Sequence, residues 1–530
     1  MTRLPSANHN SLWRGGLALF QRRYAHRWGA LVLGVSLLAP AVPAQLPALG
    51  DGAEMTTSAE RQLGERVARE LYRDPDYVDD PILTDYVQSI WQPLLAAARL
   101  RGELPADLDE RFAWEILLGR DRTLNAFALP GGYLGLHLGL IGAVSRPDEL
   151  ASVLAHELSH VTQRHISRIM GQQSRQAPWL LGALVLAALA ASKNPEAANA
   201  MIVGGQAAAA QSQLSFSRDM EREADRVGLG VMTQAGFEPQ GFISMFEKLQ
   251  QAARLNDNGS YPYLRSHPLT TERIADVRAR LPLVAASAPP VAVDLTHAMM
   301  AARARVLTNP GADVLRSWRQ EPQAPDFAQR PIAQRAAALY AAALACAQQR
   351  DGLEARKWAE QLLQLTRMGL PRSVTLSPTE RQARLLIADL ALGAAVPGET
   401  AHAISLLQEG TPVHRADVLL LAELYNQSGQ AVQAAALLQP WVVEHPRDAS
   451  AWQVLSSAWA LQHQVLRSIR AEGEVQMAHL DYAGAVDRYK AARDWADRPG
   501  NPIDMMELSV IDTRLHQAEQ LLREQQQDDH

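Results

Sequence analysis

The C-terminal half of the chain repeats a helical pattern every 34 residues, and this repeat limits the folds that are open to it. In "LAELYNQSGQAVQAAALLQPWVVEHP" small and apolar residues recur at the spacing of two antiparallel helices. Val418 and Trp452 are 34 residues apart, as are Leu421 and Leu455. One helical pair cannot bury its own apolar face, so the pairs have to stack. We therefore expect an α-solenoid over residues 301–530.

The 34-residue spacing is that of tetratricopeptide repeats. Weaker copies of the pattern occur in "LYAAALACAQQRDGLEARKWAEQLL", "LLIADLALGAAVPGETAHAISLL" and "GEVQMAHLDYAGAVDRYKAA". The sequence predicts an array of about four such units. Another kind of all-helical bundle is the alternative.

Residues 1–44 have the layout of a signal peptide. Arg22, Arg23 and Arg27 precede the apolar run "GALVLGVSLLAPAV", and the small residues "VPA" end at Ala44. The apolar run is shorter than the roughly 20 residues that a membrane span needs. We expect cleavage near Ala44 and export of the chain, with an uncleaved anchor as the alternative.

Composition excludes some classes of function. The net charge is −6, and Lys and Arg are scattered rather than clustered, which argues against nucleic acid as a partner. Cys346 is the only cysteine, so an intramolecular disulfide is excluded and stability has to come from packing. A hydrophobic content of 47% is enough for a large buried core.

The pattern between the signal peptide and the repeats is mixed. "RFAWEILLG" and "TLNAFALPGGYLGLHLG" have apolar runs broken by Pro and Gly, which predicts strand, turn and strand in a small sheet. After Ser145 the spacing of Leu150, Val153, Leu154 and Leu158 is that of a helix. "LPLVAASAPPVAV" is typical of a linker, which we place at residues 286–300.

The helix after Ser145 contains "HELSH", residues 156–160. Residues four apart share one face of a helix, so His156 and His160 can bind one metal ion while Glu157 reaches its open side. Zinc suits two imidazoles and an open position. A cation there lowers the pKa of water, and Glu157 would take the proton as the water attacks a carbonyl carbon. One such motif also occurs by chance, so a third ligand is needed.

The third ligand is predicted in "FSRDMEREADRVG", another helical stretch. Glu221 and Asp225 are four residues apart, and two carboxylates on one face repel each other unless a cation is near. Glu221 can ligate the metal, and Asp225 can accept the free ring N–H of a ligating histidine. The alternative is a solvated face paired with Arg218, Arg222 and Arg226.

The motifs "NAFALPGG", "HELSH" and "SRDMEREAD" together resemble the signature of the M48 family of zinc peptidases over roughly residues 55–285. The resemblance implies a zincin-like metallopeptidase domain, helical with a small β-sheet, which we place at residues 45–285. It also implies one zinc ion per chain, with Glu221 as the third ligand and Asp225 one turn later.

A further element, "RSHPLTTERI", resembles the "SHP" element of the family and places His267 near the site. His267 could orient the substrate, stabilise the oxyanion, or occupy the open position of the zinc and hold the enzyme inactive. The sequence does not choose between these roles. A loop histidine without a role is the alternative.

The strand and turn before the zinc helix would, by resemblance, form the edge to which an extended peptide adds as a further strand. The residues of this predicted substrate edge are Asn125, Ala126, Phe127, Ala128, Leu129, Pro130, Gly131 and Gly132. Backbone pairing gives little sequence specificity, which suits an enzyme that meets many unfolded chains.

Two other features have weaker interpretations. The uncharged run at residues 177–191 predicts a buried helix, with a lid over the site or an interfacial helix that touches a membrane as alternatives. His165 follows His160 by five residues, well round the helix, and is expected to be solvated.

The whole arrangement is mainly α: a signal peptide, a metallopeptidase domain and a tetratricopeptide array. It resembles periplasmic members of the family whose function is quality control of outer-membrane proteins. This implies a zinc endopeptidase that degrades misfolded or stalled outer-membrane proteins and assists their assembly, with the repeats docking substrate or the barrel assembly machinery. A repeat-based chaperone or scaffold with a latched or idle zinc site is the alternative.

Overall fold

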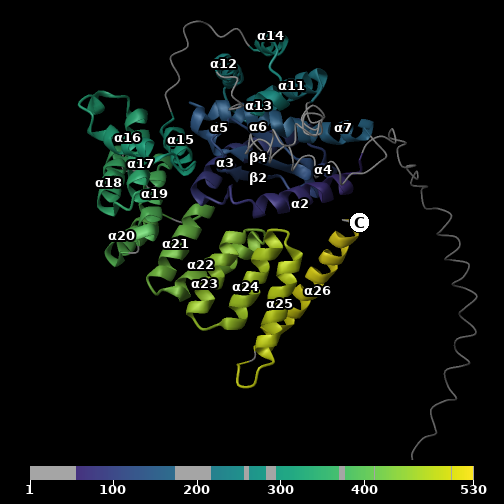
Figure 1. The fold of residues 1–530 in the computed structure, drawn as a ribbon, viewed down its shortest axis with the longest axis vertical. Coiled ribbons are helices and arrows are strands. Elements are labelled where there is room, and N and C mark those ends of the chain that lie inside the picture. The colour runs from purple at the N-terminus through teal and green to yellow at the C-terminus, as the bar shows by residue number, and fades with distance from the viewer. Residues whose placement is uncertain are drawn as a thin grey trace, which may run out of the picture. The chain divides into compact units, whose positions relative to one another are not determined.

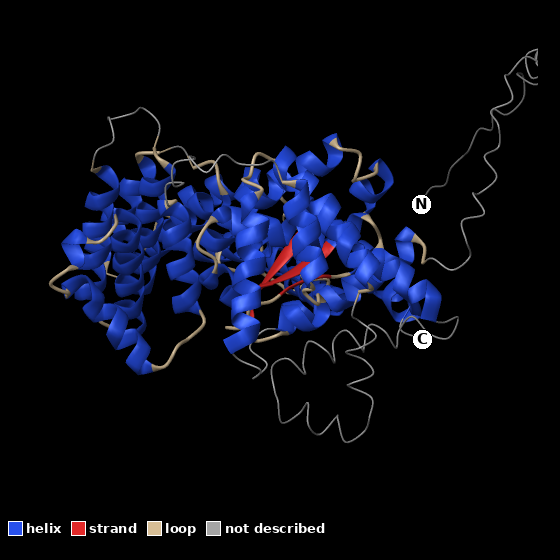
Figure 2. Ribbon diagram, turned by 90° about the horizontal axis from the view of Figure 1, so that it is seen from above, coloured by secondary structure: helices blue, strands red, loops and turns tan. Residues whose placement is uncertain are grey.

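A small β-sheet and the helices around it make up the N-terminal part of the protein (Figures 1 and 2). This computed structural model describes residues 55–173, 216–255, 262–281, 294–368, 376–394, 396–410, 412–502 and 504–528. The helices before residue 282 are α2 (Thr57–Arg73), α3 (Pro81–Leu100), α4 (Ala106–Arg111), α5 (Leu138–Ala143), α6 (Pro147–Thr162), α7 (His165–Gln173), α11 (Arg218–Gln234), α12 (Gln240–Leu255), α13 (Pro262–Ser266) and α14 (Thr271–Arg280).

The sheet has the strand order β1-β2-β4-β3. Its strands are β1 (Tyr77–Val78), β2 (Glu115–Gly119), β3 (Ala126–Ala128) and β4 (Tyr133–His137). β2 and β4 are parallel, whereas β3 pairs antiparallel with β4 and lies at an edge of the sheet. The strand, turn and strand expected from the sequence therefore correspond to β3, the short 3-10 turn η1 (Pro130–Gly132) and β4.

Glycines make the turn between β3 and β4 possible. Gly131 and Gly132 have φ angles of 70° and 83°, in the left-handed region that favours glycine. A Cβ on Gly131 would also lie 2.8 Å from the Cα of Arg61, and one on Gly132 would lie 2.8 Å from the Cβ of Phe112. The close approach of the turn to α2 and to the residues before β2 thus depends on these two glycines.

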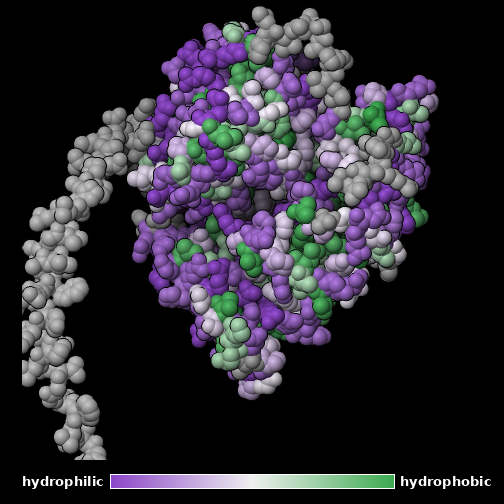
Figure 3. Space-filling model, turned by 180° about the vertical axis from the view of Figure 1, so that it is seen from behind, coloured by the Kyte–Doolittle hydropathy of each residue, from purple (hydrophilic) through white to green (hydrophobic). Residues whose placement is uncertain are grey.

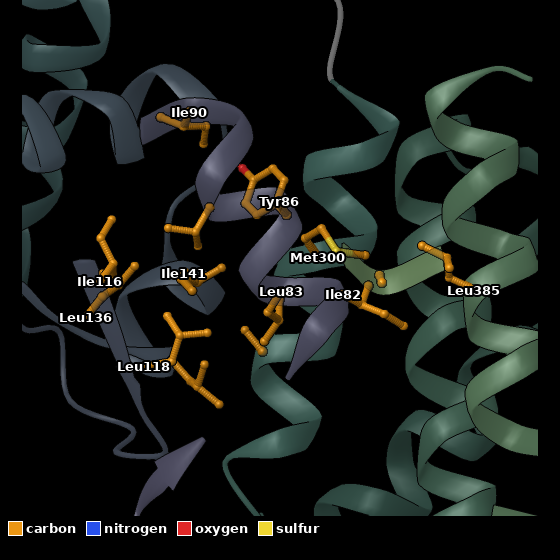
Figure 4. Close-up of a cluster of buried hydrophobic side chains, with 14 of the residues drawn as sticks. Ile82, Leu83, Tyr86, Ile90, Ile116, Leu118, Leu136, Ile141, Met300 and Leu385 are labelled. Atoms are coloured by element: carbon orange, nitrogen blue, oxygen red, sulfur yellow. The ribbon is translucent and has the colours of Figure 1, made fainter. Parts of the chain in front are cut away.

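The helix α3 lies between the sheet and the C-terminal helices (Figure 4). Leu83 and its neighbours on α3 pack in one hydrophobic cluster with Leu118 of β2 and Leu136 of β4. The same cluster includes Met300 and Leu385 from the C-terminal helices. One continuous core therefore joins the sheet to the region that the sequence assigned to a separate repeat domain.

From residue 294 onward the described chain consists of helices connected by short turns (Figure 1). They are α15 (Leu295–Leu307), α16 (Ala312–Gln320), α17 (Ile332–Gln348), α18 (Gly352–Arg367), α19 (Pro378–Ala394), α20 (Pro397–Gln408), α21 (Arg415–Gln427), α22 (Ala431–Glu444), α23 (Ala449–Leu461), α24 (Val465–Ala478), α25 (Tyr482–Ala496) and α26 (Met505–Asp528), with 3-10 turns η2 (Glu321–Gln323) and η3 (Phe327–Gln329). From α17 to α26, each helix packs against the next along the chain.

The repeat spacing is visible in the turns of this region. Gly429 ends the turn after α21 with a φ of 75°, and His463, 34 residues later, has a φ of 60° after α23. The left-handed conformation is strained for a residue other than glycine, but His463 adopts it and so forms the same turn as Gly429. Local geometry therefore recurs at the period that the sequence predicts.

Three aspartates near the start of α3 bind arginines of the C-terminal helices. Asp80 accepts from Arg303 of α15 at 2.9 Å, and Asp85 accepts from Arg381 of α19 at 2.6 Å. The third pair joins Asp79 and Arg415 of α21, with a distance of 2.8 Å from Nη1 to Oδ1. Arg381 and Arg415 are 34 residues apart, so successive helical pairs present an arginine to α3.

One predicted boundary is corrected by the structure. Asp294 accepts hydrogen bonds from the backbone N–H groups of Thr296 and His297 and caps α15, so the last residues of the expected 286–300 linker are helical. α15 packs against α5 and α17, which is incompatible with a free linker there. The expected signal peptide, 1–44, and the 177–191 run lie outside the described residues.

Surface and core follow the ordinary division of polar and apolar residues. The face seen in Figure 3 is mainly hydrophilic, with hydrophobic residues in small groups. Within the described ranges, no helix is both long and apolar enough to cross a membrane.

Arg303→Ala should destabilise the protein by about 3–5 kcal/mol, because it leaves the buried Asp80 and the nearby Asp389 without their shared cation. Chemical denaturation followed by circular dichroism would measure the loss. Arg316→Ala on α16 is the control, since the exposed Arg316–Asp313 pair should contribute less than about 1 kcal/mol. Equal losses of unfolding free energy in the two variants would contradict the role of Arg303 as the shared partner of Asp80 and Asp389.

Candidate metal centre

The two histidines of "HELSH" lie on one buried face of α6. The helix begins at Pro147, whose fixed φ suits a first helical position. Its apolar residues are distributed around the helix, and nearly every side chain is buried. His156 and His160 are one turn apart, and their Nε2 atoms lie 3.0 Å from each other. Both imidazoles therefore direct Nε2 toward one common point.

The helix α11 lies against α6 and brings carboxylates to these histidines. Glu221 and Asp225 are one turn apart on the buried face of α11. The helices can approach because Gly228 has no side chain: a Cβ there would lie 3.0 Å from Ala155 O and 3.1 Å from His156 N. Gly228 therefore permits the separation at which both carboxylates reach the imidazoles.

Glu221 and His267 complete a group of four potential ligands. Glu221 Oε2 lies 3.4 Å from His156 Nε2, and Glu221 Oε1 lies 3.5 Å from His160 Nε2. His267, directly after α13, places Nδ1 at 3.0 Å from Glu221 Oε1 and 3.3 Å from His156 Nε2. One ligand atom from each of the four residues lies within 4.8 Å of the others.

The geometry and the donor set of this group fit zinc. Four ligands at the usual zinc bond lengths of about 2.0–2.1 Å stand roughly 3.3 Å apart in a tetrahedron. The separations of His156 Nε2 from His160 Nε2, from His267 Nδ1 and from the nearer oxygen of Glu221, which are 3.0, 3.3 and 3.4 Å, are close to that value. All four side chains are buried, and a cation would compensate the charge of the carboxylate there. No second group of this kind occurs among residues 55–528 where they are described.

Asp225 lies behind His156 and is held by an arginine. Asp225 Oδ1 is 3.0 Å from His156 Nδ1, on the side of the ring away from the other ligands. Arg273 of α14 donates to both oxygens of Asp225 at 2.7 Å, and its Nη1 lies 2.7 Å from Glu221 Oε2. Sequence reasoning missed Arg273; the signal available was the need of two buried carboxylates for a cation.

The pKa values reflect this buried network of charges. Burial by itself would lower the pKa of His156, but the adjacent carboxylates of Asp225 and Glu221 overcome it and raise the pKa to about 9. Burial and the charge of His156 hold the pKa of His160 well below its ordinary value. Burial would raise the pKa of Asp225, but Arg273 and His156 bring it below the ordinary value. The carboxylates therefore stay ionised, as metal ligands and their supports need to be.

Glu157 connects the centre to the sheet. Its Oε2 accepts a hydrogen bond from the backbone N–H of Ala128 at 2.9 Å. Its Oε1 is buried, has no hydrogen bond within the described part of the chain and lies 3.4 Å from His267 Nε2. Burial raises the pKa of Glu157. One oxygen is thus anchored at the edge strand, and the other is free to exchange a proton.

The predicted substrate edge coincides with β3 and the turn after it. Ala126–Ala128 form β3, whose one partner among the described strands is β4, and Pro130–Gly132 form η1. Phe127 packs its ring over Gly135, where a Cβ would lie 2.1 Å from the ring. Asn125 is buried, and its backbone carbonyl accepts from His137 N at 3.0 Å.

The prediction that His165 is solvated is wrong. His165 is fully buried, and its Nδ1 lies 2.9 Å from His160 Nδ1. The prediction treated His165 as a continuation of the zinc helix, but α6 ends at Thr162 and Arg164 has a φ of 53°. The chain turns there, and α7 begins with His165 directed back at His160.

Two aromatic rings cover the histidines and were not expected from the sequence. Phe216, just before α11, stacks on His160 with 3.8 Å between ring centroids. Tyr263 stacks on His267 at 4.6 Å. The rings surround the polar centre with apolar groups, which strengthens the electrostatic interactions inside it.

Comparison with known proteins gives an independent view of the same region. Residues 81–281 match the model of the family described as peptidase family M48. This range includes all four potential ligands together with Glu157 and Asp225.

Three known proteins are similar to this chain, two of them over most of its length. The Beta-barrel assembly-enhancing protease of Escherichia coli (strain K12) is 32% identical over 450 residues, which is 83% of this chain and 85% of the relative. The Putative beta-barrel assembly-enhancing protease of Vibrio cholerae is 28% identical over 475 residues, which is 87% of this chain and 92% of the relative. The Mitochondrial metalloendopeptidase OMA1 of Saccharomyces cerevisiae is 29% identical over 201 residues, 37% of this chain and 55% of the relative.

Gly228→Val should weaken both folding and zinc binding, because the added side chain separates α11 from α6 and withdraws Glu221 and Asp225 from the histidines. Overpacking of this kind costs about 1–3 kcal/mol, and displaced ligands should lower zinc affinity by at least about tenfold. Thermal unfolding and competition with a zinc chelator measure the two effects. Gly393→Val is the control, since a Cβ at that exposed site meets nothing within 4 Å. Unchanged zinc affinity in Gly228→Val would refute the role of this contact.

Proposed function

The chain belongs to peptidase family M48 and is a zinc metalloprotease, and from this premise we propose that it is a periplasmic endopeptidase acting on misfolded or stalled outer-membrane proteins. The observation that carries the proposal is the buried group of His156, His160 and Glu221 beside Glu157 and the edge strand β3. A metal-ligand group, a proton acceptor and a free strand edge are the parts that peptide hydrolysis needs.

His156, His160 and Glu221 are the residues we assign as zinc ligands. Asp225 keeps the ring of His156 in place through Nδ1, at 3.0 Å, so that Nε2 faces the metal position. Arg273 in turn holds Asp225 and Glu221 at 2.7 Å. Bound zinc supplies a Lewis acid that lowers the pKa of water and polarises the scissile carbonyl.

Glu157 is the general base in this proposal. Its free Oε1 takes the proton of the attacking water, and the same oxygen later donates a proton to the leaving amine. The hydrogen bond from Ala128 N to Oε2 keeps the side chain oriented during both transfers. Burial raises the pKa of Glu157, which makes it a better proton acceptor than an ordinary glutamate.

The substrate would bind as an extended strand against β3. Among the described strands, Ala126–Ala128 pair with β4 alone, and the N–H of Ala128 donates to Glu157. A peptide on this edge would therefore lie next to the general base. Backbone pairing selects for unfolded chains rather than for a particular sequence.

The cellular role is proposed from the relatives. Proteins named as beta-barrel assembly-enhancing proteases align with 83% and 87% of this chain, which includes the helical region as well as the metal centre. We propose that this chain, too, is exported by a signal peptide at residues 1–44, degrades outer-membrane proteins that fail to assemble, and assists the assembly of others.

The helices beyond residue 300 are proposed to be tetratricopeptide repeats that dock substrate or the outer-membrane assembly machinery. Their 34-residue period and the recurring turns at Gly429 and His463 support this identification. The arginine contacts with α3 link the repeats firmly to the metallopeptidase part at residues 45–285.

The position of His267 favours a second candidate function. Its Nδ1 lies 3.0 Å from Glu221 Oε1 and 3.3 Å from His156 Nε2, where a fourth ligand would stand. With zinc bound, His267 in this position would act as a fourth ligand and would keep substrate and water away from the metal. A protein latched in this way would act as a chaperone or scaffold through its repeats until the loop carrying His267 moves.

Glu157→Gln should retain zinc and the fold but lose hydrolysis of an unfolded outer-membrane protein by about 10²–10⁴-fold, because an amide cannot take the proton. Cleavage is followed by gel electrophoresis and zinc by elemental analysis. Glu247→Gln, an exposed residue of α12, is the matched control and should cleave normally. Normal cleavage by Glu157→Gln would remove the peptidase proposal; survival of the cellular function without cleavage would favour the scaffold.

His267→Ala should increase the rate of cleavage, since the fourth position then becomes free for water and substrate. Zinc content should stay at one ion per chain because three ligands remain. His297→Ala, another buried histidine away from the centre, is the control and should show no gain in rate. A loss of activity in His267→Ala would instead assign this residue to substrate orientation or to the oxyanion, and would remove the latch.

A further inference from the structure

A second histidine contacts His160 on the side away from the metal ligands. His165 Nδ1 lies 2.9 Å from His160 Nδ1. On its other side, His165 Nε2 lies 3.0 Å from Glu223 Oε2. His165 is fully buried, so its ring cannot exchange these partners for bulk water. A continuous line of hydrogen bonds therefore runs from Glu223 through His165 to His160.

The positions of the protons along this line follow from the acceptor at its end. A carboxylate only accepts, so His165 has to carry its proton on Nε2 and donate it to Glu223. A neutral His165 then has a lone pair on Nδ1, which accepts from His160 Nδ1–H. The proton of His160 is thereby kept on Nδ1, and its Nε2 lone pair faces His156 and Glu221.

The opposite arrangement is unfavourable at both ends. If His165 donated from Nδ1 to His160, its Nε2 would have no proton for Glu223, and two acceptors would face each other at 3.0 Å. His160 would then carry its proton on Nε2, where it could not ligate a metal. Glu223 thus selects the ligating form of a histidine that it does not touch.

We propose that His165 and Glu223 are positioning residues that hold His160 in its Nδ1–H form, with Nε2 directed at the zinc. The proposal rests on the assignment of His160 as a ligand made above. Arg168 of α7 donates to the same oxygen of Glu223 at 3.0 Å and keeps the carboxylate in place.

The helix α11 accounts for the placement of this carboxylate. Glu221 and Asp225 share the face that packs on α6, and Glu223, two residues from each, points to a different side of the helix. The turn at Arg164 brings His165 into the space between Glu223 and His160. One helix therefore supplies a ligand and the orienting carboxylates of both "HELSH" histidines: Asp225 directly for His156, and Glu223 through His165 for His160.

The deciding experiment compares two substitutions at the same position in the full chain. Asn Oδ1 can take the place of His Nδ1 as an acceptor, whereas Leu fills a similar volume without any acceptor. His165→Leu should lower zinc affinity by roughly 10- to 100-fold, the range found when supporting partners of a metal ligand are removed. His165→Asn should retain most of the affinity. Zinc affinity is measured by competition with a chelator, and the absorption of the cobalt-loaded protein reports whether the ligand geometry is kept.

A double-substitution cycle separates the relay from general effects on folding. Glu223→Leu should weaken zinc binding in the parent chain but have little further effect when His165 is already Leu. His297→Leu is the control for loss of a buried, hydrogen-bonded histidine, and should lower the melting temperature without changing zinc affinity.

The outcomes are distinct. Rescue by Asn, together with coupling between His165 and Glu223, supports the relay. Equal affinities of the Asn and Leu variants, or a Glu223 effect that persists in the His165→Leu background, would overturn it. If His160 is not a zinc ligand, the result is different: the His160→Ala variant would bind zinc as tightly as the parent chain.

Discussion

The close contact between α6 and α11 is the constraint on which the rest of the site depends. It brings Glu221 and Asp225, each buried, to within 3.5 Å of imidazole nitrogens on the facing helix. Charges in such a place are tolerated only when every one has a partner. Arg273 supplies one cation, and zinc would supply another when it binds. The centre is therefore stable as a whole, and removal of one member leaves the others buried without compensation.

The residues of the metal centre are also connected to the sheet, and through the sheet to the C-terminal helices. Glu157 extends from α6 to Ala128 of the edge strand, so the proposed general base and the proposed peptide-binding edge share one hydrogen bond. Behind the sheet, α3 packs on β2 and β4 with one face and meets α15 and α19 with the other. The arginines of α15, α19 and α21 hold the start of α3 through its aspartates. The helical array is therefore joined through α3 to the sheet that carries the proposed substrate edge.

Much of this was accessible from the sequence because the relevant interactions are local. The four-residue spacing of His156 and His160 predicts a shared helical face, and the zinc metalloprotease that it indicated is confirmed by the family match. The mainly helical fold with a small sheet is confirmed too, whereas the tetratricopeptide identity of the repeats stays a prediction. Arg273 and the partners of His165 could not be predicted, since no local pattern says which distant side chain meets a buried carboxylate or imidazole.

The sequence alone indicated which residues can ligate a metal, which helix faces they share and the 34-residue period of the C-terminal helices, because helical periodicity acts over a few residues. Only the tertiary structure decided that His267 lies beside Glu221 and His156, that His165 turns back toward His160 after Arg164, and that the expected linker ends in a capped helix. These outcomes depend on contacts between residues far apart in the chain, and on a single left-handed residue that ended one helix and redirected the next. Such contacts are selected by packing and by the compensation of buried charge, which no short stretch of sequence specifies.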